Sequence, residues 1–267
     1  MPALSKTCRH FLLCSGVARS PAIILSIALA SFANLAYGAE VRIAVAANFT
    51  DTTRELISAF EETSRHRVTA SYGSTGKLYA QIEHGAPFDV FLAADSRRPR
   101  LLEENGQGVA GTRFTYAKGK LALWSPVTEL FDDAPTWLSS GDFRKLAIAN
   151  PKTAPYGAAA EQVLNSLGLW TSLQPKLVRG DSIAQTFQFV ATDNAEAGFV
   201  ALSQVRAWEN QDGTLWPVPQ DYYAPIEQQA ILLTTGAGNP AAKDWLTFLH
   251  SEAARAIIEG FGYDTQS

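Results

Sequence analysis

The stretch Ser71–Ile82, SYGSTGKLYAQI, combines two glycines, three serine or threonine side chains and a lysine where a helix is predicted to begin. Such a stretch is typical of a corner that holds an anion through N–H groups and hydroxyls at a helix N-terminus. A nucleotide-binding P-loop requires the pattern G-x-x-x-x-G-K-[ST]. Here Ser71 replaces the first glycine, and Leu78 follows Lys77. The pattern fails at two positions, which leaves another kind of anion-binding corner or a simple helix cap.

A strand, a small or polar corner and a helix start follow one another four times along the chain. The corners are 47–50 (ANFT), 73–76 (GSTG), 153–156 (TAPY) and 180–183 (GDSI). Helix N-termini present unpaired N–H groups and a partial positive charge. Corners that converge on one point would therefore bind an anion without lysine or arginine. Most such corners in α/β proteins bind nothing, so the pattern alone leaves this open.

Helix-start signals accompany each corner. Asn48 and Ser74 are candidate N-caps, and Asp51 is placed to complete a capping box with Asn48. Pro155 suits a first helical turn, and the fourth helix has Asp181 or Ser182 as its cap.

The sequence shows no comparable pattern for a serine hydrolase or for a histidine metal site. The sequence contains no G-x-S-x-G motif, and His66, His84 and His250 are far apart with no metal-ligand spacing. An exported hydrolase therefore remains an alternative without a motif to support it.

Adjacent tyrosines, Tyr222 and Tyr223, allow a second alternative, in which phenolate oxygens bind a ferric ion. The competing interpretation is that the pair packs against a crossing strand. Three further acids, Asp89, Asp95 and Glu196, are candidate site acids, but they also fit strand ends or the surface.

The first 38 residues have the pattern of a secretory signal peptide. A basic beginning is followed by an apolar run of roughly 10–15 residues that ends in small residues, with cleavage expected between Gly38 and Ala39. An uncleaved membrane anchor is the alternative. Both cysteines, Cys8 and Cys14, lie in this segment, so we expect a mature protein without disulfides.

Charge argues against nucleic acid and anionic membrane as partners. Removal of residues 1–38 takes away Lys6, Arg9 and Arg19 and no acid, so the formal net charge falls from −4 to −7. An acidic surface does not exclude a small anionic ligand whose site is built from local dipoles.

Apolar runs of strand length alternate with helical patterns through the rest of the chain. Predicted strands cover 41–47, 67–72, 87–95, 145–150 and 175–180, with another in GFVAL, 198–202. This alternation predicts an α/β protein with mostly parallel sheets.

Five blocks of sequence resemble the periplasmic molybdate-binding proteins of ABC importers. They are AEVRIAVAANFTDTTRELISAFEE, SYGSTGKLYAQIEHGAPFDVFLAAD, RFTYAKGKLALWS, IANPKTAPYGAAAEQVLNSLGL and AEAGFVALSQV, in the family's order and over nearly all of the mature chain. The pairing of QIEHGAPFDVFLAAD with NPKTAPYG is the most specific part.

The resemblance implies a two-lobed periplasmic-binding-protein fold, with a mostly parallel sheet flanked by helices in each lobe. Two hinge crossings are expected near 116–121 and 222–226. They divide the chain into a signal peptide (1–38), lobe 1 (39–118 plus 223–267) and lobe 2 (119–222). The implied protein is a monomeric periplasmic receptor, not an enzyme, which has no cofactor and delivers its ligand to a membrane permease.

The implied ligand is molybdate, and tungstate as well, so that molybdenum is bound only as the oxyanion. The family's binding positions fall on Ala47 and Asn48, on Ser74 and Thr75, on the N–H of Tyr156 and on Ile183. Two departures concern ligand geometry. Ala47 replaces a hydroxyl residue of relatives, and Ala201 stands where some members have a ligand tyrosine. The chain instead resembles the subgroup that uses the corner tyrosine, Tyr156.

The chemistry of the matched positions agrees with this ligand. Molybdate is a tetrahedral dianion that only accepts hydrogen bonds, and the corners offer donors, with Asp181 the only acid near them. Hydrogen phosphate would require an acceptor. Receptors for sulfate, which has the same charge and shape, or for ferric ion remain the alternatives.

Overall fold

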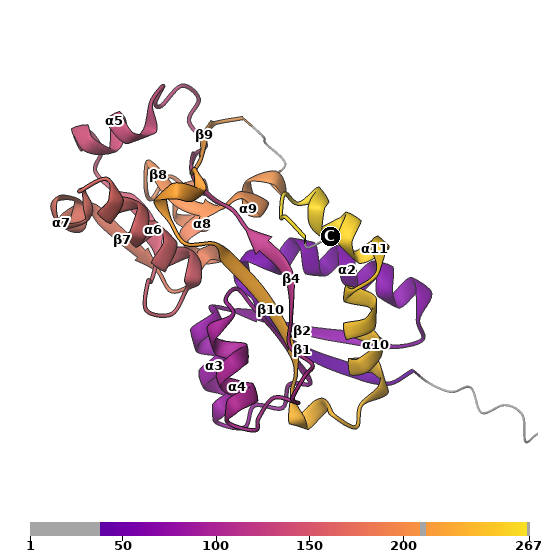
Figure 1. The fold of residues 1–267 in the computed structure, drawn as a ribbon. Coiled ribbons are helices and arrows are strands. Elements are labelled where there is room, and N and C mark those ends of the chain that lie inside the picture. Colours follow the sequence, from indigo (N-terminus) through magenta and orange to yellow (C-terminus); the bar gives the residue numbers. More distant parts are fainter. Residues whose placement is uncertain (1–37, 209–211, 266–267) are drawn as a thin grey trace, which may run out of the picture. The chain divides into compact units, whose positions relative to one another are not determined.

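Two five-stranded sheets organise the computed structural model, which describes residues 38–208 and 212–265 (Figure 1). The first has the strand order β2-β1-β3-β10-β4. Its strands are β1 (Glu40–Ala46), β2 (Arg67–Gly73), β3 (Val90–Ala93), β4 (Phe114–Gly119) and β10 (Ile226–Leu232). The second has the order β7-β6-β8-β5-β9. Its strands are β5 (Leu121–Ser125), β6 (Leu146–Ala149), β7 (Leu177–Gly180), β8 (Ala197–Ala201) and β9 (Thr214–Pro217).

Each sheet contains one reversed strand. In the first sheet β1 pairs in parallel with β2 and β3, whereas β10 pairs antiparallel with both β3 and β4. In the second sheet β6 pairs in parallel with β7 and β8, whereas β5 pairs antiparallel with β8 and β9. The other four strands of each sheet therefore run in one direction, which agrees with the predicted mostly parallel sheets even though half of the pairings are antiparallel.

The reversed strands, β5 and β10, directly follow the places where the chain passes between the sheets. It leaves the first sheet at Gly119 and enters the second at Leu121, then leaves β9 and returns at Ile226. The two expected crossings are thus confirmed, while the exact lobe boundaries at 118/119 and 222/223 stay a prediction.

Both faces of the first sheet are covered by helices, which explains why β3 and the second half of β1 are buried without alternation. One face packs against α2 (Thr50–Thr63), α10 (Pro240–Leu249) and α11 (Glu252–Gly260). The other packs against α3 (Thr75–Glu83) and α4 (Arg97–Glu104). Strand β2 lies at the edge and alternates in exposure.

The second sheet is also covered on both sides. Leu123 and Phe199 pack towards α5 (Ala134–Ser140) and α6 (Pro155–Ser166) on one face. On the other, Trp124 packs against α8 (Ile183–Ala191) and α9 (Leu202–Arg206), with its ring stacked 4.8 Å from that of Phe187. The remaining elements are α7 (Trp170–Leu173) and the 3-10 turns η1 (Ala47–Phe49), η2 (Gln174–Lys176), η3 (Gln220–Tyr222) and η4 (Thr234–Gly236).

Residues 1–37 of the predicted signal peptide, including Cys8 and Cys14, lie outside the described residues. Within 38–208 and 212–265, none of the helices combines the length and the apolar character that a membrane crossing requires.

Gly157 allows the first turn of α6 to approach the end of β6 closely. A Cβ atom at this position would lie 2.3 Å from the backbone oxygen of Ala149. We therefore expect Gly157→Ala to lower the free energy of unfolding by about 1–3 kcal/mol, because α6 must shift away from the sheet. Urea unfolding measures the change. The control is Gly260→Ala at the end of α11, where nothing lies within 4 Å. Equal stabilities of the two variants would contradict this account.

Candidate oxyanion site

All four predicted corners lie at the carboxyl ends of parallel strands. Strands β1 and β2 end at the first and second corners, and β6 and β7 end at the third and fourth. Direct contacts bring corners from the two sheets together. The N–H of Gly76 donates to the oxygen of Thr153 at 2.8 Å, and Lys77 pairs with Asp181 at 2.8 Å. Helix α8 also contacts η1 of the first corner.

The first corner is a 3-10 turn in which Ala47 and Asn48 are both 4% exposed. The amide of Asn48 donates to Gln228 Oε1 at 2.7 Å and to the Tyr263 hydroxyl at 3.0 Å, so it does not cap α2. The predicted capping box is therefore wrong, and Asp51 instead pairs with Arg54 on the surface. The Asn48 side chain belongs to a buried network behind the corner.

The second corner supplies two hydroxyls. Ser74 occupies the N-cap of α3, but its hydroxyl makes no capping bond and is buried without a partner among the described residues. The hydroxyl of Thr75 accepts a bond from the N–H of Ala94 at 3.1 Å, which leaves its own proton free to be donated. Both side chains are at most 3% exposed.

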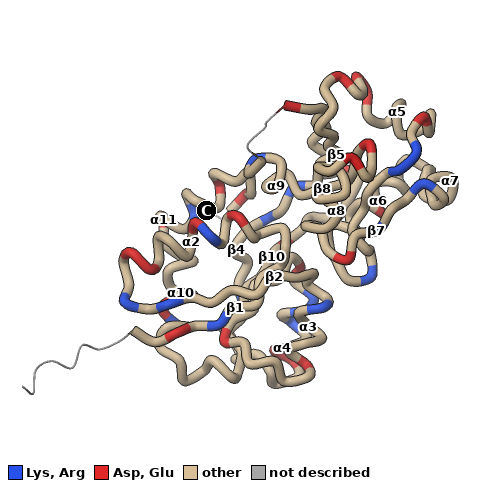
Figure 2. Tube along the Cα trace, turned by 180° about the vertical axis from the view of Figure 1, so that it is seen from behind, with Lys and Arg blue, Asp and Glu red and all other residues tan. Residues whose placement is uncertain are grey.

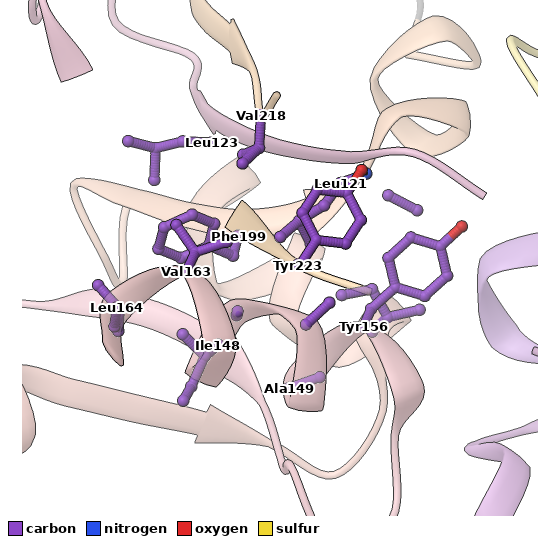
Figure 3. Packing of buried hydrophobic residues seen from close by; sticks show 14 of the residues in the cluster. Leu121, Leu123, Ile148, Ala149, Tyr156, Val163, Leu164, Phe199, Val218 and Tyr223 are labelled. Atoms are coloured by element: carbon purple, nitrogen blue, oxygen red, sulfur yellow. The ribbon is translucent and has the colours of Figure 1, made fainter. Parts of the chain in front are cut away.

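At the third corner, Pro155 takes the first helical position of α6, as predicted, and Tyr156 follows with its N–H in the unpaired first turn. The Tyr156 ring is 1% exposed, and Figure 3 shows its hydroxyl directed away from the other labelled side chains of the cluster. Within the described part of the chain, neither this hydroxyl nor that of Thr153 has a hydrogen-bond partner.

The fourth corner is closed by a reciprocal cap. Ser182 is the N-cap of α8 and accepts from the N–H of Gln185 at 3.3 Å, while Gln185 accepts from the N–H of Asp181 at 2.6 Å. Ile183 begins the helix, so its N–H belongs to the unpaired first turn. Its carbonyl accepts a bond from Gln204 at 3.3 Å.

Three hydroxyls, on Ser74, Thr153 and Tyr156, are thus buried at two touching corners without any partner in 38–208 and 212–265. Buried polar groups are nearly always paired, so each orphan requires an explanation. Hydroxyls and helix-start N–H groups can all donate. The arrangement therefore suits a ligand that only accepts hydrogen bonds.

The three candidate acids are each engaged with a backbone N–H group or an arginine. Asp89 accepts from the N–H of Arg42 at 2.7 Å, Asp95 pairs with Arg98, and Glu196 binds Arg144 at 2.7 Å. All three therefore stabilise the fold through these contacts, which agrees with the alternative that they are not site acids. Asp181 is exposed and paired with Lys77, and Figure 2 shows acidic and basic residues interspersed along the described trace.

The adjacent tyrosines are packed against neighbouring groups, as the competing interpretation expected. The hydroxyl of Tyr223 accepts the N–H of Leu121 at 3.1 Å, and its ring lies in the cluster of Figure 3. Tyr222 packs edge-on against Trp216, with ring centroids 5.9 Å apart. The described residues contain no group of three His, Cys, Asp or Glu side chains placed to hold a metal ion.

Ala201 ends β8 and offers no hydroxyl, and its N–H is already donated to Gln204 at 3.1 Å. Two residues were not singled out from the sequence, Thr153 and Gln228. Among the described residues, the Thr153 hydroxyl and the Gln228 Nε2 group have no hydrogen-bond partner. The NPKTAPYG motif contained a signal for Thr153, whereas Gln228 lies in the mixed polar and apolar strand β10, IEQQAIL, which carries no comparable motif.

Comparison with known proteins gives a consistent result. Residues 41–264 match the family model described as bacterial extracellular solute-binding protein. The molybdate-binding protein ModA of Azotobacter vinelandii is 50% identical over 91% of this chain and 97% of its own length. ModA of Rhodobacter capsulatus is 48% identical over 92% of this chain and 94% of its own length. A solved periplasmic molybdate-binding protein of Azotobacter vinelandii superposes with a TM-score of 0.82 at 38% identity, covering 85% of this chain and 100% of that one.

The buried tyrosines behind the corners predict a loss of stability at high pH. Burial raises the pKa of Tyr263 to about 12 from an ordinary value of 10.0. Because the folded state holds this proton more tightly, the resulting stability is present below pH 10 and is lost as the pH rises towards about 12. We expect the loss to be about 2–3 kcal/mol.

Urea unfolding between pH 9 and 12 measures this loss. Tyr263→Phe should be less stable than the wild type at pH 8, since it lacks the 2.8 Å bond to the Asn48 oxygen, but its stability should fall less steeply above pH 10. The same slope in both proteins would be inconsistent with a raised tyrosine pKa.

Proposed function

The chain belongs to the bacterial extracellular solute-binding proteins, and we propose that it is the periplasmic receptor that binds molybdate for an ABC importer. The observation that carries this proposal is the set of buried, unpartnered hydroxyls on Ser74, Thr153 and Tyr156. The identity to molybdate-binding proteins along almost the whole chain supports the same ligand. The protein is a receptor and not an enzyme.

Molybdate suits these groups because it is a fully deprotonated tetrahedral dianion. It accepts hydrogen bonds from all sides and needs no acceptor from the protein. Burial raises the pKa of the Tyr156 hydroxyl well above its usual value, so this group keeps its proton. Helix N-termini supply partial positive charge without the large desolvation cost of a buried lysine.

The proposed binding residues are Ala47 and Asn48 through backbone N–H groups, Ser74 and Thr75 through hydroxyls and N–H groups, and Tyr156 and Ile183 through N–H groups. Hydrogen bonds to a charged group contribute roughly 1.5–3 kcal/mol each. Six or seven such bonds, less the costs of association, reach about −12 kcal/mol, which corresponds to nanomolar binding.

The ligand is proposed to draw the two lobes, 39–118 plus 223–267 and 119–222, together by hinge bending, and the closed form then docks on the permease. Tungstate, with the same charge and shape, is proposed as a second ligand. We further propose that the receptor is a monomer released into the periplasm by cleavage near Gly38.

Thermal unfolding of ligand-free protein tests the ligand. A ligand at one hundred times its dissociation constant stabilises by about 2.7 kcal/mol, which raises Tm by several degrees. We expect this rise with molybdate and tungstate, but not with equal concentrations of sulfate, phosphate or ferric citrate. A rise with sulfate or ferric citrate alone would overturn the proposed ligand and leave the receptor role standing.

Thr75 is a proposed site residue whose hydroxyl accepts one hydrogen bond, from the N–H of Ala94, and retains its own proton for the ligand. We expect Thr75→Ala to weaken molybdate binding about tenfold or more, because one hydrogen bond to a charged ligand is lost. Thr75→Ser keeps the hydroxyl and should bind nearly as the wild type does. Calorimetric titration measures both, and equal affinities of Thr75→Ala and wild type would remove Thr75 from the site.

A further inference from the structure

Two unpartnered donors meet at the hinge beside Gly119, the last residue of β4. A Cβ atom on Gly119 would lie 2.1 Å from the Tyr156 hydroxyl oxygen and 3.1 Å from Nε2 of Gln228. Both of these atoms are buried and neither has a hydrogen-bond partner among the described residues. Only a glycine leaves room for them here, and the two donors face one neighbourhood.

The orientation of the Gln228 side chain follows from its other end. Its Oε1 accepts the amide of Asn48 at 2.7 Å and the hydroxyl of Tyr116 at 3.4 Å. The Nε2 group has no hydrogen-bond partner of its own among the described residues, although Gln228 is 0% exposed. Gln228 lies between a residue of the first corner, Asn48, and a residue of the third, Tyr156.

A buried amide N–H₂ and a buried hydroxyl without acceptors are costly. The carboxylates of Asp89, Asp95 and Glu196 are already paired with other groups. A ligand group that is itself a donor would leave both protein donors unpaired. An oxygen atom of an oxyanion would accept from both groups at once.

We propose that Gln228 is a further oxyanion-contacting residue, which donates from Nε2 together with the Tyr156 hydroxyl and so selects fully deprotonated tetrahedral dianions. The inference rests on the proposed function of the same site. An Nε2 group held in this orientation can only donate, so hydrogen phosphate, whose own proton needs an acceptor, is disfavoured at this position. The site would then distinguish anions by whether they carry a proton of their own.

The test is Gln228→Glu, which keeps the shape of the side chain but replaces a donor by a negatively charged acceptor. We expect molybdate affinity to fall at least 100-fold at pH 8, with a smaller preference for molybdate over hydrogen phosphate. Affinity should recover by up to tenfold for each unit that the pH falls towards 6, because a protonated glutamic acid can donate again.

The matched control is Gln229→Glu, one residue further along β10. Gln229 accepts from Arg113 at 2.8 Å and donates to Thr115 at 3.1 Å, so its amide is engaged away from the corners. We expect this variant to keep the wild-type affinity and its pH profile. Similar losses in both variants would attribute the effect to added charge and overturn the contact.

Gln228→Met keeps the test valid if the glutamate variant does not fold. We expect this variant to fold, which circular dichroism checks, and to bind molybdate at least tenfold more weakly than the wild type. A wild-type affinity would show that Nε2 faces only a buried water, and would overturn the proposal. A wild type that fails to bind molybdate overturns the proposed function instead. The same three variants are then compared with the oxyanion that does stabilise the wild type.

Discussion

A ligand that accepts hydrogen bonds and never donates them imposes one constraint on the whole structure, because its site must gather donors and exclude acceptors. Donors that await a ligand must stay unpaired when it is absent, at a cost of about 1–3 kcal/mol for each buried group. Ser74 shows the constraint most directly. It occupies an N-cap, where a serine oxygen ordinarily accepts a bond from the helix, yet its hydroxyl makes no such bond. Local helix stability is given up so that the hydroxyl remains available.

A buried network of neutral hydrogen-bonding groups lies behind the first corner. Asn48 donates to Gln228 and to Tyr263, and Tyr263 in turn donates to the Asn48 oxygen at 2.8 Å. Ser203 of α9 donates to that oxygen at 3.1 Å, so the network joins the first corner to the second sheet. Because all of these groups are neutral and mutually paired, they fix the backbone of the first corner without adding charge. The backbone of this proposed binding corner is thereby held before a ligand arrives, which would reduce the entropy lost on binding.

The α/β class and the four corners could be predicted from the residues, because buried apolar runs and helix-start residues are local signals. The two crossings were expected only from the resemblance to the molybdate-binding proteins. The six proposed binding positions remain predictions, although the structure brings their corners together. Local rules were wrong where long-range contacts compete with them. Asn48 has the residue type of an N-cap, but Gln228, 180 positions away, holds its amide. Gln228 itself could not be predicted as a site residue, because the role of one of two adjacent glutamines in β10 depends on what the fold places around it.

Two direct contacts between the corners, one ion pair and one backbone hydrogen bond, are individually weak. The Lys77–Asp181 pair has side chains 49% and 71% exposed, and pairs so exposed contribute about 0–1 kcal/mol. The bond from Gly76 to Thr153 adds about 1 kcal/mol, which is the usual net value for a neutral hydrogen bond. In the proposed complex, hydrogen bonds to the dianion would contribute roughly 1.5–3 kcal/mol each and would reach corners of both sheets. We therefore propose that the direct contacts, together with the 3.1 Å bond from Ser203 to the Asn48 oxygen, set the register in which the corners meet, and that a bound oxyanion adds to the free energy that holds them there.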